Sequence, residues 1–333
     1  NIHKLGYNNY IEFILSYLQI AITFVIWDFK EIKNLVQTSN LISLNEGNTQ
    51  EVKFINGQTE IILKREDLNP TGSWKDRGTA FKVTELIANN VKEAVIATSG
   101  NAAISFLTYL KQIPEFKLHV VVSPNINPNK LKKIQDLING TNNILYISEN
   151  SRKESVEIAA KYSCVNLRSS IDESIVKGYW SLGFELKKYI LPDRQIAIFA
   201  PVSSGTAFVG LVQGLHLKLD HEWQLPKIYA VQTTATYPIV SLLNINVHEQ
   251  ESNADAIVDK TALRGPQIIK VIKETNGGAI AVTNQELEEA KQFIKQKINI
   301  DLSYTSLLSV AAYLRLAKQN VKLDRVILIA SGT

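Results

Sequence analysis

The stretch EDLNPTGSWKDRGTAF, from Glu66 to Phe81, contains the end of a strand, a turn and the start of a helix. Residues 60–67 (EIILKRED) overlap the beginning of this stretch. They alternate apolar and charged side chains, which is typical of a half-buried strand. The Pro and Gly of NPTG then indicate a turn. Apolar residues recur at helical spacing after the turn, and Ser73 or Asp76 is predicted to cap that helix. Lys75 is therefore expected in its first turn.

The composition of the 333-residue chain is that of a globular protein with one large or two ordinary domains. Its 36 basic and 32 acidic residues leave a mild net charge of +4, which argues against binding to nucleic acid. Cys164 is the single cysteine, so an internal disulfide framework and a cysteine-based zinc site are excluded. We expect Cys164 to be a buried apolar residue, in a protein of the reducing cytoplasm that holds no metal.

Residues 10–29 form the most apolar segment of the chain. Polar residues interrupt it every three to four positions, which predicts an amphipathic helix packed on the protein body and neither a membrane span nor a signal peptide. The chain holds no methionine, so either its composition is extreme or methionines are missing from the sequence and some spacings are short by one. It stops directly after a predicted strand, and we expect a short C-terminal tail beyond it.

Helical patterns alternate with short β-rich runs from residue 80 onward. Several runs are apolar throughout, which is typical of parallel strands covered by helices on both faces. The sequence therefore predicts an α/β fold with two open, mostly parallel sheets flanked by helices. We expect residues 80–165 to form a smaller, mobile domain inserted into a larger one made of residues 1–79 and 166–333. The predicted strands cover residues 93–98, 117–123, 143–148, 195–202, 227–232 and 325–331.

Ligands bind to open sheets of this kind where strands end and helices begin, and four such junctions have unusual chemistry. At the first, the positive potential of a helix start and partial desolvation favour a neutral Lys75 amine able to form a Schiff base, although a solvated surface lysine is the common alternative. At the second, Thr98, Ser99 and Gly100 form a tight turn suited to a carboxylate, and Asn101 could reach a ring oxygen. An ordinary helix cap would have the same sequence.

The third junction follows an apolar strand. Ser203, Ser204, Gly205 and Thr206 offer hydroxyls and consecutive N–H groups at a helix start, which can hold a phosphate monoester without a metal, although a purely structural turn is an alternative. The pattern is not that of a P-loop. At the fourth junction Ser331 could hydrogen-bond a neutral ring nitrogen. One ligand has a phosphate, an aldehyde, a ring hydroxyl and a ring nitrogen together: pyridoxal 5'-phosphate.

The motifs at these junctions resemble those of fold-type II pyridoxal-phosphate enzymes, which share a tryptophan synthase β-like fold. NPTGSWKDRG is similar to the lysine motif of the family, which implies that Lys75 forms the Schiff base with the cofactor. ATSGNAA resembles the asparagine loop, which implies that Asn101 lies beside the phenolic oxygen and residues 98–100 lie near the substrate carboxylate. SSGTA occupies the place of the phosphate loop. The resemblance covers residues 26–333.

Within that family, IWDFKEI and SLNEGNTQEV most resemble the first segments of threonine synthases. This resemblance implies conversion of O-phosphohomoserine and water to threonine and phosphate by a homodimer. The phosphate of that substrate needs a second anion site, for which Arg77, Lys177 and Arg264 are candidates. Gln50 replaces a proline of the usual segment, the phosphate loop is richer in serine, and the final motif is reduced to ASGT.

Lys75 is predicted to act as the general base at Cα and at later carbons of an amino-acid substrate. A serine at the ring nitrogen would moderate the electron withdrawal by the cofactor. The lysine and asparagine loops are also found in serine or threonine dehydratases and in cysteine synthase-type β-replacement enzymes, which are the close alternatives. A third alternative is a binding protein that kept the fold and lost catalytic turnover. A fourth alternative is an unrelated nucleotide-binding α/β protein.

Overall fold

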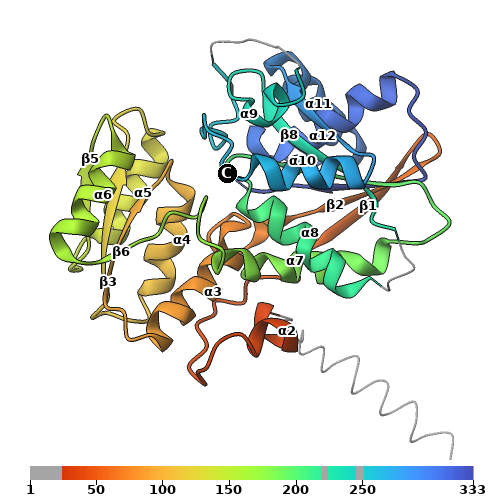
Figure 1. Cartoon of the computed structure of the whole chain (residues 1–333). Helices are drawn as coiled ribbons and strands as arrows, with labels where there is room; N and C mark the ends of the chain where they lie inside the picture. The colour runs from red at the N-terminus through yellow and green to blue at the C-terminus, as the bar shows by residue number, and fades with distance from the viewer. Residues whose placement is uncertain (1–24, 220–223, 245–250, 333) are drawn as a thin grey trace, which may run out of the picture.

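Two sheets organise the protein in the computed structural model, which describes residues 25–219, 224–244 and 251–332 (Figure 1). The larger sheet has the strand order β1-β2-β10-β7-β8-β9, and only the β1–β2 pair is antiparallel. The smaller sheet has the order β5-β4-β3-β6 and is parallel throughout. The predicted α/β architecture is confirmed. In sheet order, the larger sheet contains Glu51–Asn56, Thr59–Lys64, Arg325–Ile329, Ile196–Pro201, Lys227–Thr233 and Gly278–Val282, and the smaller Ile144–Ile147, Lys117–Val122, Glu93–Ala97 and Val165–Asn166.

Helices cover both faces of the larger sheet, which is why its central strand β7 is apolar and buried throughout (Figure 1). One face packs against helices α7 (Trp180–Leu186), α8 (Thr206–Lys218) and α10 (Gly265–Glu274). The other packs against α11 (Asn284–Ile298) and α12 (Tyr304–Lys318). All six predicted parallel strands are present, whereas β1, β6 and β9 were not predicted from the apolar runs.

The smaller sheet lies to one side of the larger one and has its own helices (Figure 1). Its main core includes residues of α3 (Lys75–Ala88), α4 (Asn101–Leu110) and α5 (Pro128–Ile138), and α6 (Ser151–Tyr162) packs on the opposite face. The Trp27 ring stacks on Phe81 with 6.0 Å between centroids. The N-terminal region therefore shares the core of the smaller sheet. The expected division into domains at residues 80 and 165, and the expected mobility of the smaller domain, stay predictions.

The prediction that the strand within residues 60–67 is half-buried is wrong. Side chains from Ile61 to Lys64 are all buried, because β2 lies between β1 and β10 and is covered on both faces. The Lys64 amine forms ion pairs with Glu51 at 3.2 Å and Glu185 at 2.7 Å. Carboxylates from other parts of the chain therefore allow Lys64, a charged residue of the alternating pattern, to be buried.

The remaining predictions concern the N-terminal segment and the cysteine. The helix expected over residues 10–29 lies for the most part outside the described residues, which begin with Val25. No helix in the described part of the chain has the length and apolar character needed to cross a membrane. Cys164 is half-buried rather than buried. The shorter helices are Ile26–Asp28, Lys30–Lys33, Glu66–Leu68, Ile175–Tyr179, Lys187–Tyr189 and Pro238–Ser241.

Candidate active site

The turn before Lys75 is fixed against the end of β10. Ser73 forms an isolated antiparallel bridge with Gly332, and the Trp74 N–H donates to the carbonyl of Ser331 at 3.1 Å. Gly332 has φ +108, and a Cβ there would lie 2.2 Å from the carbonyl oxygen of Gly72. The close approach therefore requires glycine, and it holds the first and fourth predicted junctions side by side.

The Lys75 side chain is half-buried and forms no hydrogen bond or ion pair with any residue that the structure describes. Burial lowers the pKa of its amine, while the negative charge of Asp259 acts in the opposite direction. Of the two predicted caps, the Ser73 hydroxyl accepts a hydrogen bond from the Lys75 N–H at 3.1 Å. Asp76 does not cap the helix, because its carboxylate accepts hydrogen bonds from the Thr71 hydroxyl and the Ser105 hydroxyl, both at 2.6 Å. The first turn of α3 is thereby anchored to the neighbouring turn and to α4.

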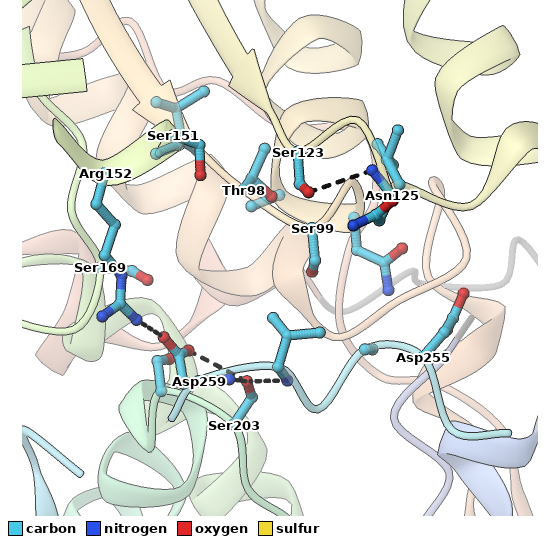
Figure 2. A pocket seen from close by; sticks show the side chains of 18 of the residues that line it. Thr98, Ser99, Ser123, Asn125, Ser151, Arg152, Ser169, Ser203, Asp255 and Asp259 are labelled. Carbon is cyan, nitrogen blue, oxygen red and sulfur yellow. Dashed lines mark hydrogen bonds and ion pairs between the residues drawn. The ribbon is translucent and has the colours of Figure 1, made fainter. Parts of the chain in front are cut away.

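The loop between β3 and α4 presents side chains and N–H groups to a cavity. Thr98, Ser99 and Asn101 line this cavity, and Figure 2 shows the first two near its centre. The N–H groups of Ser99 and Asn101 donate to no other residue of the described ranges. Gly100 faces away: it has φ +127, its N–H donates to the Thr98 hydroxyl at 3.0 Å, and a Cβ there would lie 2.9 Å from Cδ of Lys130. Free donors at a helix start suit a carboxylate.

The loop between β7 and α8 has a similar form. Ser203, Ser204 and Gly205 line cavities, and Gly205 has the left-handed φ of +83. The N–H groups of Ser204, Gly205 and Thr206 have no acceptor within the described part of the chain. The Thr206 hydroxyl is directed elsewhere and donates to the carbonyl of Ser169 at 2.8 Å. This loop can hold an anion through its backbone and two serine hydroxyls.

A cavity of about 510 Å³ brings these junctions together, within the range of small-molecule sites. It is lined by Lys75, Thr98, Ser99, Asn101, Ser203 and Ser204. A smaller cavity of about 40 Å³ adds Gly205 and Ser331 beside Lys75. Of the residues predicted for the cofactor and for the substrate carboxylate, only Gly100 and Thr206 line neither cavity, and both contribute to loop geometry.

Sequence reasoning missed several residues of the two cavities. Their sequence signals are weak, since most belong to loops without periodicity, although Ser151 and Arg152 follow β5 at a fifth strand-to-helix junction that could have been singled out. Thr305, at the start of α12, lines the smaller cavity together with Lys75. Other residues missed are Ser123, Asn125, Asn127, Ser169, Asp255, Asp259 and Lys260.

The three residues considered for a second anion site do not line either cavity. Arg77 is fully buried, with its guanidinium 2.7 Å from Glu66 and 2.6 Å from Glu185. Arg264 is also buried and bonds to Glu173 at 2.7 Å. Lys177 lies in the short helix Ile175–Tyr179 away from the lining. The two arginines stabilise the fold because their charges are already paired.

A family model described as "Pyridoxal-phosphate dependent enzyme" matches residues 42–332. The chain belongs to this family. Among relatives of this pyridoxal-phosphate enzyme, threonine synthase of Methanocaldococcus jannaschii is 26% identical over 92% of this chain and 79% of its own. L-threonine ammonia-lyase of Thermotoga maritima is 26% identical over 82% of this chain and 67% of its own. A solved pyridoxal 5'-phosphate-dependent aspartate racemase matches with a TM-score of 0.72 at 18% identity, over 92% of this chain and 93% of that one. The predicted fold-type II architecture and cofactor are confirmed.

The residues of this pyridoxal-phosphate enzyme fit its cofactor. The free N–H groups at the start of α8 match the chemistry of a phosphate, and the Lys75 amine, without a partner in the described ranges, matches that of an aldehyde. The Asn101 amide and the Ser331 hydroxyl line the smaller cavity, where they can meet a ring oxygen and a ring nitrogen. Each of the four polar groups of the cofactor therefore has a chemically matching group in the site.

Proposed function

We propose that this pyridoxal-phosphate enzyme is a carbon–oxygen lyase of amino acids, and that it acts as a threonine synthase, converting O-phosphohomoserine and water to threonine and phosphate. One observation carries the proposal: a Lys75 amine, unpaired within the described residues, opens into a cavity between the two helix starts of α4 and α8, whose N–H donors are free among those residues. The names of relatives at 26% identity support the choice of substrate.

Ser203 to Thr206 would hold the cofactor phosphate, with Asn101 at the ring oxygen and Ser331 at the ring nitrogen. When bound, the cofactor withdraws electrons from Cα of the amino acid joined to it. The Ser331 hydroxyl would leave the ring nitrogen neutral, because it cannot supply the negative charge that stabilises a protonated ring. Such a setting suits elimination and replacement of groups at Cβ and Cγ.

The other groups of the chain bind the substrate and move its protons. The N–H groups at Ser99 and Asn101, with the Thr98 and Ser99 hydroxyls, would bind the carboxylate. The Lys75 amine would accept the proton from Cα and deliver protons at later carbons. A neutral amine is needed for this role, and burial lowers the pKa of Lys75 in the required direction.

The substrate phosphate would lie at the far side of the same cavity, where Arg152 and Lys260 are the cationic lining residues besides Lys75. Arg152 is, however, ion-paired with Asp259, and Asp255 also lines the cavity. This neutralised rim favours a second candidate, a serine or threonine dehydratase, whose substrates carry no distal anion. The relative named L-threonine ammonia-lyase supports the same alternative.

The test begins with the absorbance spectrum of the purified protein after addition of pyridoxal phosphate, with Lys75→Ala as control. O-phosphohomoserine, L-threonine, L-serine and O-acetylserine with sulfide are then supplied separately. Threonine with an equal amount of released phosphate supports the threonine synthase. Keto acid from threonine or serine without phosphate release supports the dehydratase, and cysteine from O-acetylserine supports β-replacement. A bound cofactor with no turnover of any of these substrates would overturn the proposed lyase activities.

A further inference from the structure

The phosphate loop is in contact with a carboxylate of the chain itself. The Ser203 hydroxyl donates to Oδ2 of Asp259 at 3.1 Å and accepts hydrogen bonds from the N–H groups of Val258 and Asp259, both at 3.3 Å. The guanidinium of Arg152, at the start of α6, forms an ion pair with the other carboxylate oxygen. Figure 2 shows this chain of contacts from Arg152 through Asp259 to Ser203.

The segment that carries Asp259 is held in this position from behind. Ala254 and Ile257 are 2% and 6% exposed and pack in the core on one face of the larger sheet. The Asp259 side chain is 22% exposed, so water screens its charge only in part. Its carboxylate therefore faces the first serine of the loop as a fixed negative charge.

A phosphate monoester carries about −1.5 to −2 charges at pH 7. Its arrival at Ser203 would bring two anions to one hydroxyl, and like charges at such distances repel strongly in a partly buried site. The carboxylate must leave Ser203 or the phosphate must bind less tightly.

We propose that Asp259 competes with the cofactor phosphate for Ser203 and thereby lowers the affinity of this chain for pyridoxal phosphate. The inference rests on the proposed function, since it takes the loop from Ser203 to Thr206 as the phosphate site. When the Asp259 carboxylate loses its hydrogen bond to Ser203, it can remain paired with Arg152. Asp259 is a determinant of cofactor affinity because its carboxylate opposes the phosphate. Burial lowers the pKa of the Lys75 amine, and the negative charge of Asp259 also acts on that amine, in the opposite direction.

The chain offers a matched control in the same segment. Asp255 lines the same cavity, but its carboxylate bonds to the Lys130 amine at 2.9 Å and to the Asn127 amide at 3.1 Å. Figure 2 shows Asp255 apart from Asp259 along the segment. Removal of the Asp255 charge changes the net charge of the cavity by as much as removal of the Asp259 charge. It leaves the hydrogen bond between Ser203 and Asp259 in place.

The experiment titrates cofactor-free protein with pyridoxal phosphate and follows binding by absorbance and fluorescence. Asp259→Asn is expected to lower the Kd by about tenfold or more, because it removes a full charge next to the phosphate. Asp255→Asn is expected to change the Kd by less than about threefold, since its charge is farther away and screened. Pyridoxal, which lacks the phosphate, reports the effect of Asp259 on Lys75 alone, so Asp259→Asn should change the Kd of pyridoxal much less than the Kd of pyridoxal phosphate.

The outcomes separate this inference from the proposed function. Equal pyridoxal phosphate affinity of the natural protein and Asp259→Asn overturns the inference and leaves the function intact. Weaker binding by Asp259→Asn also overturns it, since the carboxylate would then support the site. Failure of every variant to bind the cofactor overturns both. Thermal melting checks folding, and Asp259→Ala replaces the first variant if that one does not fold.

Discussion

The starts of α4 and α8 have the same local design and different surroundings. Each follows a parallel strand, contains a serine and a glycine with positive φ, and presents N–H groups that have no acceptor in the described ranges. Among the residues that the structure describes, a carboxylate, that of Asp259, contacts the start of α8 and none contacts residues 98–101. Local sequence therefore builds the same arrangement of N–H donors twice, and a segment more than fifty residues farther along the chain distinguishes the two.

Lys75 lies between the two helix starts, so its replacement should have the largest effect. Lys75→Ala is expected to abolish the visible absorbance of the lysine-bound cofactor and to lower kcat by about 10³-fold or more, because both the covalent link and the general base are lost. Lys75→Arg is the matched control: it keeps the positive charge and should fail equally. Retention of the absorbance band in either variant would show that another amine binds the cofactor.

Lys75 is the first residue of α3, and the buried guanidinium of Arg77 joins this helix to Glu66 and to Glu185 of α7. Arg77→Met is expected to reduce the free energy of unfolding by about 3–5 kcal/mol, because buried Glu66 would lose its ion pair and Glu185 would keep only Lys64 as a partner. Arg152→Met, which removes an exposed arginine, should cost about 1 kcal/mol or less. Urea denaturation measures both, and similar losses would contradict the role of the buried network.

The same network predicts a pH dependence of stability. The positive charges of Arg77 and Lys64 lower the pKa of the Glu185 carboxyl from 4.5 to about 2, although burial acts in the opposite direction. A group whose pKa is lower in the folded state stabilises the protein above its unfolded pKa. Stability from Glu185 is therefore complete above about pH 5 and is lost as the pH falls from 4.5 towards 2. Thermal melts of the natural protein and Glu185→Gln between pH 3 and 7 should converge at low pH.

Sequence patterns predicted the strand-to-helix junctions because the chemistry of each junction is local. The loops at Ser203 and Thr98 follow their strands directly, and both line the cavity. The direction of single side chains was not predictable: the Thr206 hydroxyl turns to Ser169, 37 residues earlier in the chain. Long-range partners were equally invisible, since one of the two carboxylates that pair with buried Arg77 lies 108 residues away, at Glu185.

The smallest expected effects test the assignment of the two helix starts directly. Ser99→Ala should raise the KM for the amino-acid substrate by about 3- to 10-fold with little change in the Kd of pyridoxal phosphate, because one hydrogen bond to the carboxylate is lost. Ser204→Ala should raise the Kd of the cofactor by a similar factor with little change in KM at saturating cofactor. The pair is informative because each variant is the control of the other: both remove one hydroxyl from a half-buried serine that lines the same cavity. If both variants changed KM alone, the start of α8 would bind substrate, and the contact between Asp259 and Ser203 would then bear on substrate choice rather than on the cofactor.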